Sequence, residues 1–171
     1  MKRTAALALA LTAVAAWAQP LDRRLREAIA DFPATVSLYA KNLETGKTAG
    51  IGEDERVRTA STIKLPIMAA VFAMVEAGEA EWTDELPLAE ADKVPGSGIL
   101  REFSPGVRLR LRDLVHLMIM VSDNTATNLI LDRFPPAAIN ARLASFGLAE
   151  TRALRKVLGG SRRAPAGERY G

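Results

Sequence analysis

The chain has 171 residues, of which 49% are hydrophobic, 25% charged and 5% aromatic, a balance typical of a globular domain and not of a disordered or fibrous chain. It has no cysteine and one histidine, His116, which excludes disulfides, thiolate chemistry, iron–sulfur clusters and multi-histidine metal centres. The net charge of +3 falls to +1 without Lys2 and Arg3 (21 basic against 20 acidic residues), and no basic stripe with interleaved aromatic residues indicates a nucleic-acid partner.

The first twenty residues have the organisation of a secretory signal peptide. Lys2 and Arg3 form a charged start, an apolar run of 14 residues extends from Thr4 to Trp17, and Ala16-Trp17-Ala18 matches an A-x-A cleavage site. The alternative is an uncleaved membrane anchor, but 14 residues are short for a span and a polar amphipathic segment follows at once. We therefore predict a signal peptide over residues 1–18 and a periplasmic or secreted protein that is not held in a membrane after cleavage.

Residues 19–58 are predicted to form a helix followed by a hairpin. Apolar residues at helical spacing among arginines and glutamates predict a surface helix over 21–31. Alternating apolar and polar residues predict a half-buried strand over 35–42, and a second strand over 47–51 follows the turn Glu44-Thr45-Gly46-Lys47.

Residues 59–158 are predicted to form a helical subdomain. The apolar residues of 62–77 cover so much of the helix circumference that we expect this helix to be buried on most sides. Residues 79–107 are rich in proline, glycine and acidic residues and are expected to be a long, partly ordered connection with weak strand signals at Leu86 and Leu88. Further helices are predicted over 112–121, over 126–134 and from about Ile139 to Phe146, and residues 159–171 are predicted to be an irregular tail.

A possible nucleophile and its base stand at the start of the apolar helix. In Ser61-Thr62-Ile63-Lys64 the hydroxyl of Ser61 and the amine of Lys64 are one helical turn apart on the same face. A desolvated lysine with a lowered pKa can take the proton of a serine hydroxyl without a histidine, and the helix N-terminus offers backbone N–H groups to an oxyanion. The pattern is also common by chance, and its structural alternative is a helix-capping serine beside a solvated lysine.

The tripeptide Ser122-Asp123-Asn124 is a rarer pattern, placed between two predicted helices. Its structural alternative is a capping turn, for which its residue types are well suited. It follows the Ser61 motif in the chain, which itself lies between Thr59-Ala60 and Leu65-Pro66. Order and context together favour a functional pairing of the two motifs.

The stretches TASTIKLPI and MIMVSDNTATNLILD resemble the active-site motifs of class A β-lactamases and the wider penicillin-recognising serine hydrolases, and Gly96-Ser97-Gly98 resembles a loop at the mouth of that family's site. The resemblance covers residues 21–158. It implies an α/β (α+β) fold of the β-lactamase type, with an all-helical subdomain and an antiparallel sheet subdomain. In the family the sheet is finished by strands and a helix that come after the point where this chain stops. We therefore expect an incomplete sheet subdomain, consistent with an early stop or a frameshift near Gly159.

The resemblance also implies roles for five residues. Ser61 would be the acylated nucleophile, Lys64 its base or proton relay, and Ser122 the group that passes a proton to the leaving nitrogen. Asn124 would hydrogen-bond the substrate amide and Ser97 would line the substrate site. Asp123 is expected to hold the turn. No metal and no cofactor is predicted, and the expected partner is a small-molecule β-lactam or related acyl substrate bound by a monomer.

Two parts of the family pattern are missing from this sequence. The third motif, K-[ST]-G, should follow Asn124, but the only Lys-Thr is Lys47-Thr48-Ala49, upstream of Ser61. Lys47-Thr48 is no phosphate loop either, because Lys41 stands where that motif requires glycine. Aligning residues 151–157 with the family's loop without gaps puts Val157 where the deacylating glutamate belongs. The acidic residues after Asn124 (Asp132, Glu150 and Glu168) do not have that context.

Three functions follow from these observations. The main prediction is an exported β-lactamase-like hydrolase, of the kind involved in antibiotic resistance and β-lactam catabolism, that is impaired as an incomplete chain. Val157 favours a penicillin-binding peptidase or esterase relative that acylates but clears β-lactams slowly. The absent third motif favours a non-catalytic remnant or binding protein. His116 lies in an apolar helix without a catalytic motif around it and is interpreted as a structural or surface residue.

Overall fold

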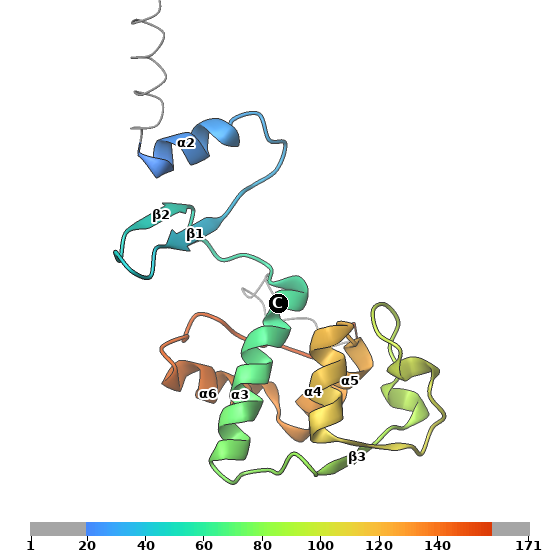
Figure 1. Ribbon diagram of the computed structural model, residues 1–171. Coiled ribbons are helices and arrows are strands. Elements are labelled where there is room, and N and C mark those ends of the chain that lie inside the picture. Colours follow the sequence, from blue (N-terminus) through green and yellow to red (C-terminus); the bar gives the residue numbers. More distant parts are fainter. Residues whose placement is uncertain (1–19, 159–171) are drawn as a thin grey trace, which may run out of the picture. The chain divides into compact units, whose positions relative to one another are not determined.

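The computed structural model describes residues 20–158, which form parts of two compact units, Met1–Val57 and Arg58–Gly171 (Figure 1). The predicted signal peptide over residues 1–18 and the predicted tail over 159–171 lie outside the described residues. In the described part no helix has the length and apolar character needed to cross a bilayer. The two units are treated separately below.

The first unit contains a short helix and a two-stranded hairpin. Helix α2 (Leu21–Ala28) precedes β1 (Leu38–Lys41) and β2 (Thr48–Ile51), which pair antiparallel from Leu38 opposite Ile51 to Lys41 opposite Thr48. Helix and strands are all shorter than the sequence predicts. One reason lies in the turn, where the Asn42 side chain accepts hydrogen bonds from the N–H groups of Glu44 and Thr45 and ends the strand. A two-stranded hairpin is marginal by itself, in keeping with the incomplete sheet that we expected.

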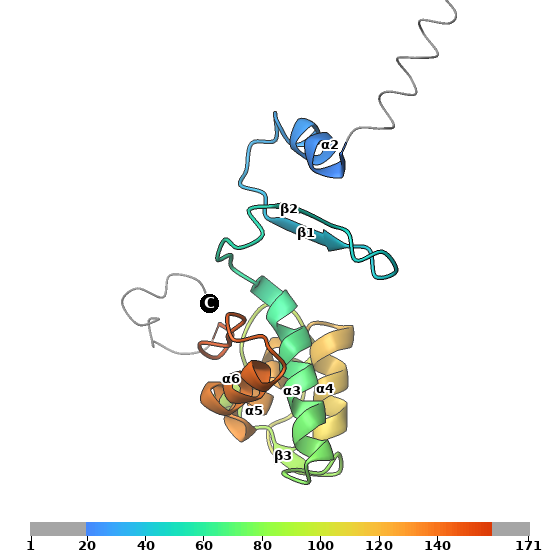
Figure 2. The same cartoon turned by 90° about the vertical axis from the view of Figure 1, so that its left-hand side faces the viewer.

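In its described residues, 58–158, the second unit contains four α-helices: α3 (Lys64–Glu76), α4 (Leu111–Met120), α5 (Asn124–Arg133) and α6 (Pro136–Ser145). Helix α3 packs on α4 and α6, and α4 packs on α5 (Figures 1 and 2). Leu114 and Met118 of α4, Ile130 of α5 and Leu143 of α6 are completely buried between them. Pro135-Pro136 separates α5 from α6, because proline is tolerated at a helix start but not within one.

The connection between α3 and α4 is more regular than the sequence predicts. Strands β3 (Glu85–Pro87) and β4 (Arg108–Arg110) pair antiparallel, so the strand signal at Leu86 was correct while β4 was not predicted. Two short 3₁₀ turns, Glu90–Asp92 and Leu100–Glu102, lie between the strands. Leu88 and Leu100 anchor the connection, because both are buried in the core of the unit. The connection is thus fixed at both ends and in the middle.

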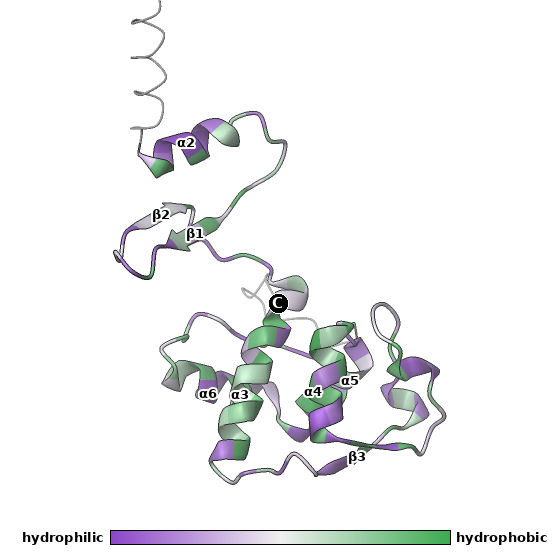
Figure 3. Ribbon diagram, viewed as in Figure 1, coloured by the Kyte–Doolittle hydropathy of each residue, from purple (hydrophilic) through white to green (hydrophobic). Residues whose placement is uncertain are grey.

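One prediction about α3 was wrong. The helix is apolar along almost its whole length, as Figure 3 shows, yet it is not buried on most sides. Ile67, Ala70, Val71 and Met74 face the core, whereas Leu65 and Phe72 are 60% and 53% exposed. An apolar pattern around a helix shows that its sequence is suited to burial on all sides. The described residues bury only one side of α3.

Candidate active site

Ser61 lies in a 3₁₀ turn (Ala60–Ile63) that leads directly into α3. The residue before it, Ala60, has a left-handed backbone with φ of 45°, which is strained for a residue with a Cβ atom. A strained backbone persists only where the surrounding structure holds it in place, and such residues are concentrated at functional sites. The turn leaves the Ser61 side chain exposed at the start of the helix.

Lys64 is buried, with 2% of its surface exposed. Its ammonium group donates three hydrogen bonds to residues of the second motif. Its Nζ donates to the Ser122 carbonyl oxygen at 2.6 Å, to Ser122 Oγ at 3.0 Å and to Asn124 Oδ1 at 2.8 Å. These bonds join residues 58 to 60 positions apart in the chain. Lys64 therefore connects the start of α3 to the turn between α4 and α5 through hydrogen bonds.

Ser122 connects Lys64 to Ser61. Its hydroxyl accepts from Lys64 Nζ and donates to Ser61 Oγ at 3.1 Å. The backbone of Ser122 is left-handed, with φ of 53°, and this unusual conformation directs both its carbonyl and its hydroxyl oxygen to Lys64. Because hydroxyl protons rotate freely, the chain Ser61–Ser122–Lys64 can carry a proton in either direction.

Asp123 holds the turn in place, as expected. Its Oδ2 accepts from the N–H groups of Ile99 and Leu100 at 2.7 and 2.8 Å, and its Oδ1 accepts from the N–H group of Ala126 at 2.9 Å, which caps α5. The close approach requires glycine at position 98, where φ is 111° and a Cβ atom would lie 2.3 Å from the Asp123 carboxylate carbon. The carboxylate thus couples the Gly96-Ser97-Gly98 loop to the second motif.

Asn124 faces Lys64 with its carbonyl oxygen and the loop with its nitrogen atoms. Its side-chain amide donates to the Pro95 carbonyl at 3.2 Å and its backbone N–H to the Ser97 carbonyl at 3.0 Å. A Cβ atom at Gly96 would lie 2.7 Å from the Asn124 amide nitrogen, so this loop also depends on glycine for its approach. Ser97 is exposed and is one of the residues that line the pocket next to Lys64 and Asn124.

Two asparagines that the sequence analysis missed position the loop over residues 151–158. Asn128 Oδ1 accepts from the Val157 N–H at 2.8 Å and its Nδ2 donates to the Val157 carbonyl at 2.9 Å. Asn140 makes the same pair of bonds to the backbone of Ala153, both at 2.8 Å. The signal was present for Asn128, because a polar residue four positions after Asn124 lies on the same face of a helix.

These elements enclose a pocket of about 310 Å³. Its lining includes Ser61, Lys64, Ser97 and Asn124, together with the loop from Arg152 to Leu158. Val157 is one of these lining residues, and it stands at the position where the sequence analysis expected a glutamate. The described residues contain no cluster of three histidine or acidic residues placed to hold a metal ion.

Burial lowers the pKa of Lys64, and the negative charge of Asp123 opposes part of this effect. A lowered lysine pKa increases the fraction of neutral amine near neutral pH, and the neutral amine is the form that accepts a proton. The pocket therefore combines an exposed hydroxyl, a hydroxyl relay and an amine suited to act as a base.

Two other sequence features lie elsewhere. His116 is exposed on α4 and does not line this pocket. Lys47 and Thr48 belong to the hairpin of the first unit. Neither takes part in the hydrogen-bonded group around Lys64 that is described above.

Comparisons with known proteins identify the family of this chain. A family model described as the β-lactamase enzyme family matches residues 20–169. The chain belongs to the β-lactamase family. The β-lactamase of Sphaerobacter thermophilus has a similar structure, with a TM-score of 0.72 and 42% identity over 77% of this chain and 50% of that one.

Two further relatives differ in their described roles. The structure of PBP-A, solved as an L158E mutant in an acyl-enzyme complex with penicillin G, has a TM-score of 0.71 and 32% identity over 75% of this chain and 51% of that one. The β-lactamase regulatory protein BlaB of Streptomyces cacaoi is 31% identical over 75% of this chain and 42% of its own length. The chain thus spans about half the length of these β-lactamase-family relatives, and its fold is a partial α+β β-lactamase fold.

Proposed function

We propose that the protein is an exported serine hydrolase that opens β-lactam amides through an acyl-enzyme on Ser61. The observation that carries this proposal is the hydrogen-bonded chain from Ser61 Oγ through Ser122 Oγ to the buried Lys64 Nζ. The substrate is a small molecule and the catalytic unit is a monomer that needs no cofactor. Membership of the β-lactamase family supports the choice of substrate.

Acylation follows from this arrangement. Ser61 Oγ attacks the carbonyl carbon of the β-lactam, and its proton passes to Ser122 Oγ while the Ser122 proton passes to neutral Lys64 Nζ. When the carbon–nitrogen bond breaks, the ring nitrogen takes a proton from Ser122, which is replenished from Lys64. The products are the Ser61 ester and a neutral amine on Lys64, so the relay is restored.

Asn124 has a supporting role in this proposal. Its Oδ1 fixes Lys64, which leaves the amide Nδ2 to interact with the Pro95 carbonyl or with a substrate amide. Ser97 is exposed and lines the same pocket, which supports a role in contacting the substrate. Both are substrate-binding residues in this proposal.

A second candidate function rests on Val157. Hydrolysis of the Ser61 ester requires a water molecule activated by a general base, and Val157, one of the residues that line the pocket, has no basic group. The protein would then acylate and release slowly, as a penicillin-binding peptidase or esterase does. The similarity to PBP-A, known as an acyl-enzyme with penicillin G in its L158E form, supports this candidate.

Covalent labelling tests the proposed nucleophile. Incubation with a fluorescent penicillin followed by denaturing electrophoresis should label the wild-type chain and leave Ser61→Ala unlabelled, whereas Ser61→Cys retains some labelling. The matched control is Ser104→Ala, which removes another exposed serine hydroxyl of the same unit and should label as the wild type does. Labelling of Ser61→Ala would refute the assignment, and an unlabelled wild type would favour a non-catalytic remnant or binding protein.

Export is part of the same proposal. Cleavage after Ala18 gives a mature chain that begins at Gln19. N-terminal sequencing of extracytoplasmic protein should find this start. A chain that begins at Met1 in the membrane fraction would contradict it.

A further inference from the structure

The charged residues that line the pocket around Ser61 all have the same sign. They are Lys64, Arg152, Arg155 and Lys156, and no acidic residue of the described chain lines this pocket. A hollow whose charged groups share one sign concentrates their field and attracts ligands of the opposite charge. The pocket is therefore suited to a substrate that carries negative charge.

Two of these four cations already have partners in the protein. Lys64 is buried, and its amine donates to Ser122 and Asn124. Lys156 forms an ion pair with Asp132, a residue of α5. The donors of Lys64 are therefore used, and the positive charge of Lys156 is balanced, before any ligand enters the pocket.

Arg152 and Arg155 are the other two cations. Both are exposed, and within residues 20–158 neither guanidinium group forms a hydrogen bond or an ion pair. The loop that carries them is held in place, because two asparagines bind its backbone at Ala153 and at Val157. The pocket thus has two guanidinium groups without a partner in the described chain, on a backbone that is fixed beside each of them.

A carboxylate is the ligand that matches these two groups, since a guanidinium group binds both oxygens of a carboxylate in one plane. In the proposed function Ser61 opens the ring amide, and Asn124 binds the other amide, to which the acyl side chain of the substrate is attached. Asn124 and both arginines line the same pocket. We propose that Arg152 and Arg155 bind a carboxylate on this acyl side chain, so that the protein prefers substrates with an anionic side chain. The proposal rests on the proposed function for the placement of the substrate.

A matched pair of penicillins tests the preference. Benzylpenicillin and carbenicillin differ by one carboxylate on the acyl side chain, and the ring carboxylate that both carry cancels in the comparison. Calorimetry on Ser61→Ala, which lacks the proposed nucleophile, measures binding without acylation. Carbenicillin should bind about fivefold more tightly than benzylpenicillin at low ionic strength, and added salt should reduce this ratio. Carbenicillin that does not bind, or that binds no more tightly than benzylpenicillin, would overturn the proposal.

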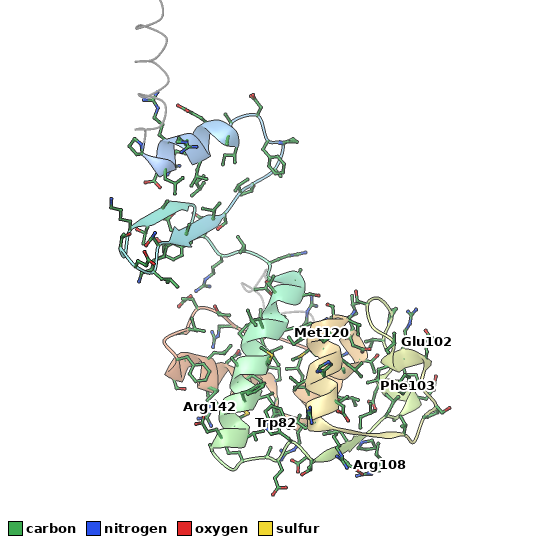
Figure 4. All side chains as sticks on the ribbon, viewed as in Figure 1. Trp82, Glu102, Phe103, Arg108, Met120 and Arg142 are labelled. Carbon is green, nitrogen blue, oxygen red and sulfur yellow. The ribbon has the colours of Figure 1, made fainter. Side chains whose placement is uncertain are left out.

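Charge variants of the same chain assign the preference to the loop. Arg152→Gln combined with Arg155→Gln should abolish it, whereas lysine at both positions keeps the charge and should retain part of it. The matched control is Arg110→Gln, which changes an exposed arginine of β4 and should leave the ratio unchanged. Its neighbour Arg108 lies at the end of the helical unit away from the start of α3 (Figure 4). If the glutamine variants weaken both penicillins by the same factor, the arginines bind the ring carboxylate and the proposal is wrong.

The wild-type chain separates this proposal from the proposed function. The mass of the intact protein after incubation with each penicillin shows whether Ser61 is acylated. Absence of an adduct with either penicillin would contradict the proposed function, and the binding comparison would still decide the side-chain preference. Adducts with both penicillins, together with equal affinities, would contradict only the preference for an anionic side chain.

Discussion

At the scale of single residues, the state of Lys64 decides whether Ser61 can react. All three donors of an ammonium group are used, on two oxygens of Ser122 and one of Asn124, so the hydrogen bonds favour the protonated amine. Burial works in the opposite direction and lowers the pKa of Lys64. Lys64 Nζ is hydrogen-bonded to Ser122 Oγ, which is hydrogen-bonded to Ser61 Oγ. The potential base therefore reaches the nucleophile through one intervening hydroxyl group.

Acylation should therefore depend on pH through Lys64. The labelling rate should rise with pH and level off once Lys64 is neutral, with a midpoint below the ordinary lysine pKa of about 10.4. Lys64→Arg keeps the positive charge but cannot lose its proton, and should reduce labelling by about 10² or more. Rapid-mixing measurements with fluorescent penicillin between about pH 6 and 10 follow the rate, and a rate that is independent of pH in the wild type would exclude Lys64 as the base.

The same pKa shift predicts how stability changes with pH. The folded chain releases the Lys64 proton at lower pH than the unfolded chain does. Between the lowered pKa and about 10.4 the unfolded state binds more protons, so the free energy of unfolding gains a contribution from Lys64 as pH rises through this window. Urea unfolding of the wild type and of Lys64→Met at a series of pH values measures this contribution, which should be absent from the variant.

Val157 should limit the second half of the reaction. Val157→Glu places a carboxylate in the lining of the Ser61 pocket, on a backbone that Asn128 already fixes from both sides. A positioned general base accelerates such a step by about 10² to 10⁴, so the fluorescent label on Ser61 should disappear faster by at least the lower of these factors. Val157→Gln introduces a side chain of about the size of glutamate but without a basic carboxylate oxygen. This variant should lose the fluorescent label from Ser61 as slowly as the wild type does. Equal rates in the two variants would show that a carboxylate at this position does not activate water.

At the scale of elements, the sequence predicted those helices whose ends carry local signals. Helices α4 and α5 were placed to within about two residues, and the N-cap role of Asp123 explains why α5 begins earlier than the apolar pattern does. The sequence grouped Ser61, Lys64, Ser122 and Asn124, and the structure brings these side chains into one hydrogen-bonded group, but the sequence did not predict how they connect. That Ser122 stands between Ser61 and Lys64, or that Asn128 holds Val157, depends on contacts between distant segments, which local periodicity does not contain.

The glycine-rich loop provides a test of how tightly two elements are coupled. Gly98→Ala adds a Cβ atom 2.3 Å from the Asp123 carboxylate carbon, so the loop and the turn before α5 must separate. Gly106→Ala is the matched control, because φ is also positive there, at 91°, but no atom lies within 4 Å of the added Cβ. Overpacking of this kind costs about 1–3 kcal/mol, so Gly98→Ala should unfold at lower urea concentration than Gly106→Ala and label more slowly. Equal urea midpoints for Gly98→Ala and Gly106→Ala would show that position 98 and the Asp123 carboxylate are not in close contact in solution.

At the scale of the whole molecule, the described residues combine a well-packed helical unit with a small hairpin unit. The helical unit holds the Ser61, Lys64, Ser122 and Asn124 side chains in one hydrogen-bonded group. It also leaves one face of α3 exposed, which a sequence alone does not reveal, because an apolar pattern gives no information on whether a covering element is present.

The 171-residue chain by itself should turn over β-lactams slowly or not at all. No K-[ST]-G motif follows Asn124, so the group expected to bind the substrate carboxylate and the second oxyanion donor are not supplied by this sequence. One oxyanion donor contributes about 3 kcal/mol to the transition state, which corresponds to a rate factor of about a hundred or more. Val157 slows deacylation in addition, since no carboxylate activates water at that position. Hydrolysis of a chromogenic cephalosporin by the purified chain, measured against Ser61→Ala, should show at most a single slow turnover. Rapid multiple turnover that Ser61→Ala abolishes would mean that the Ser61 pocket, as this chain builds it, performs both steps without the third motif or a glutamate.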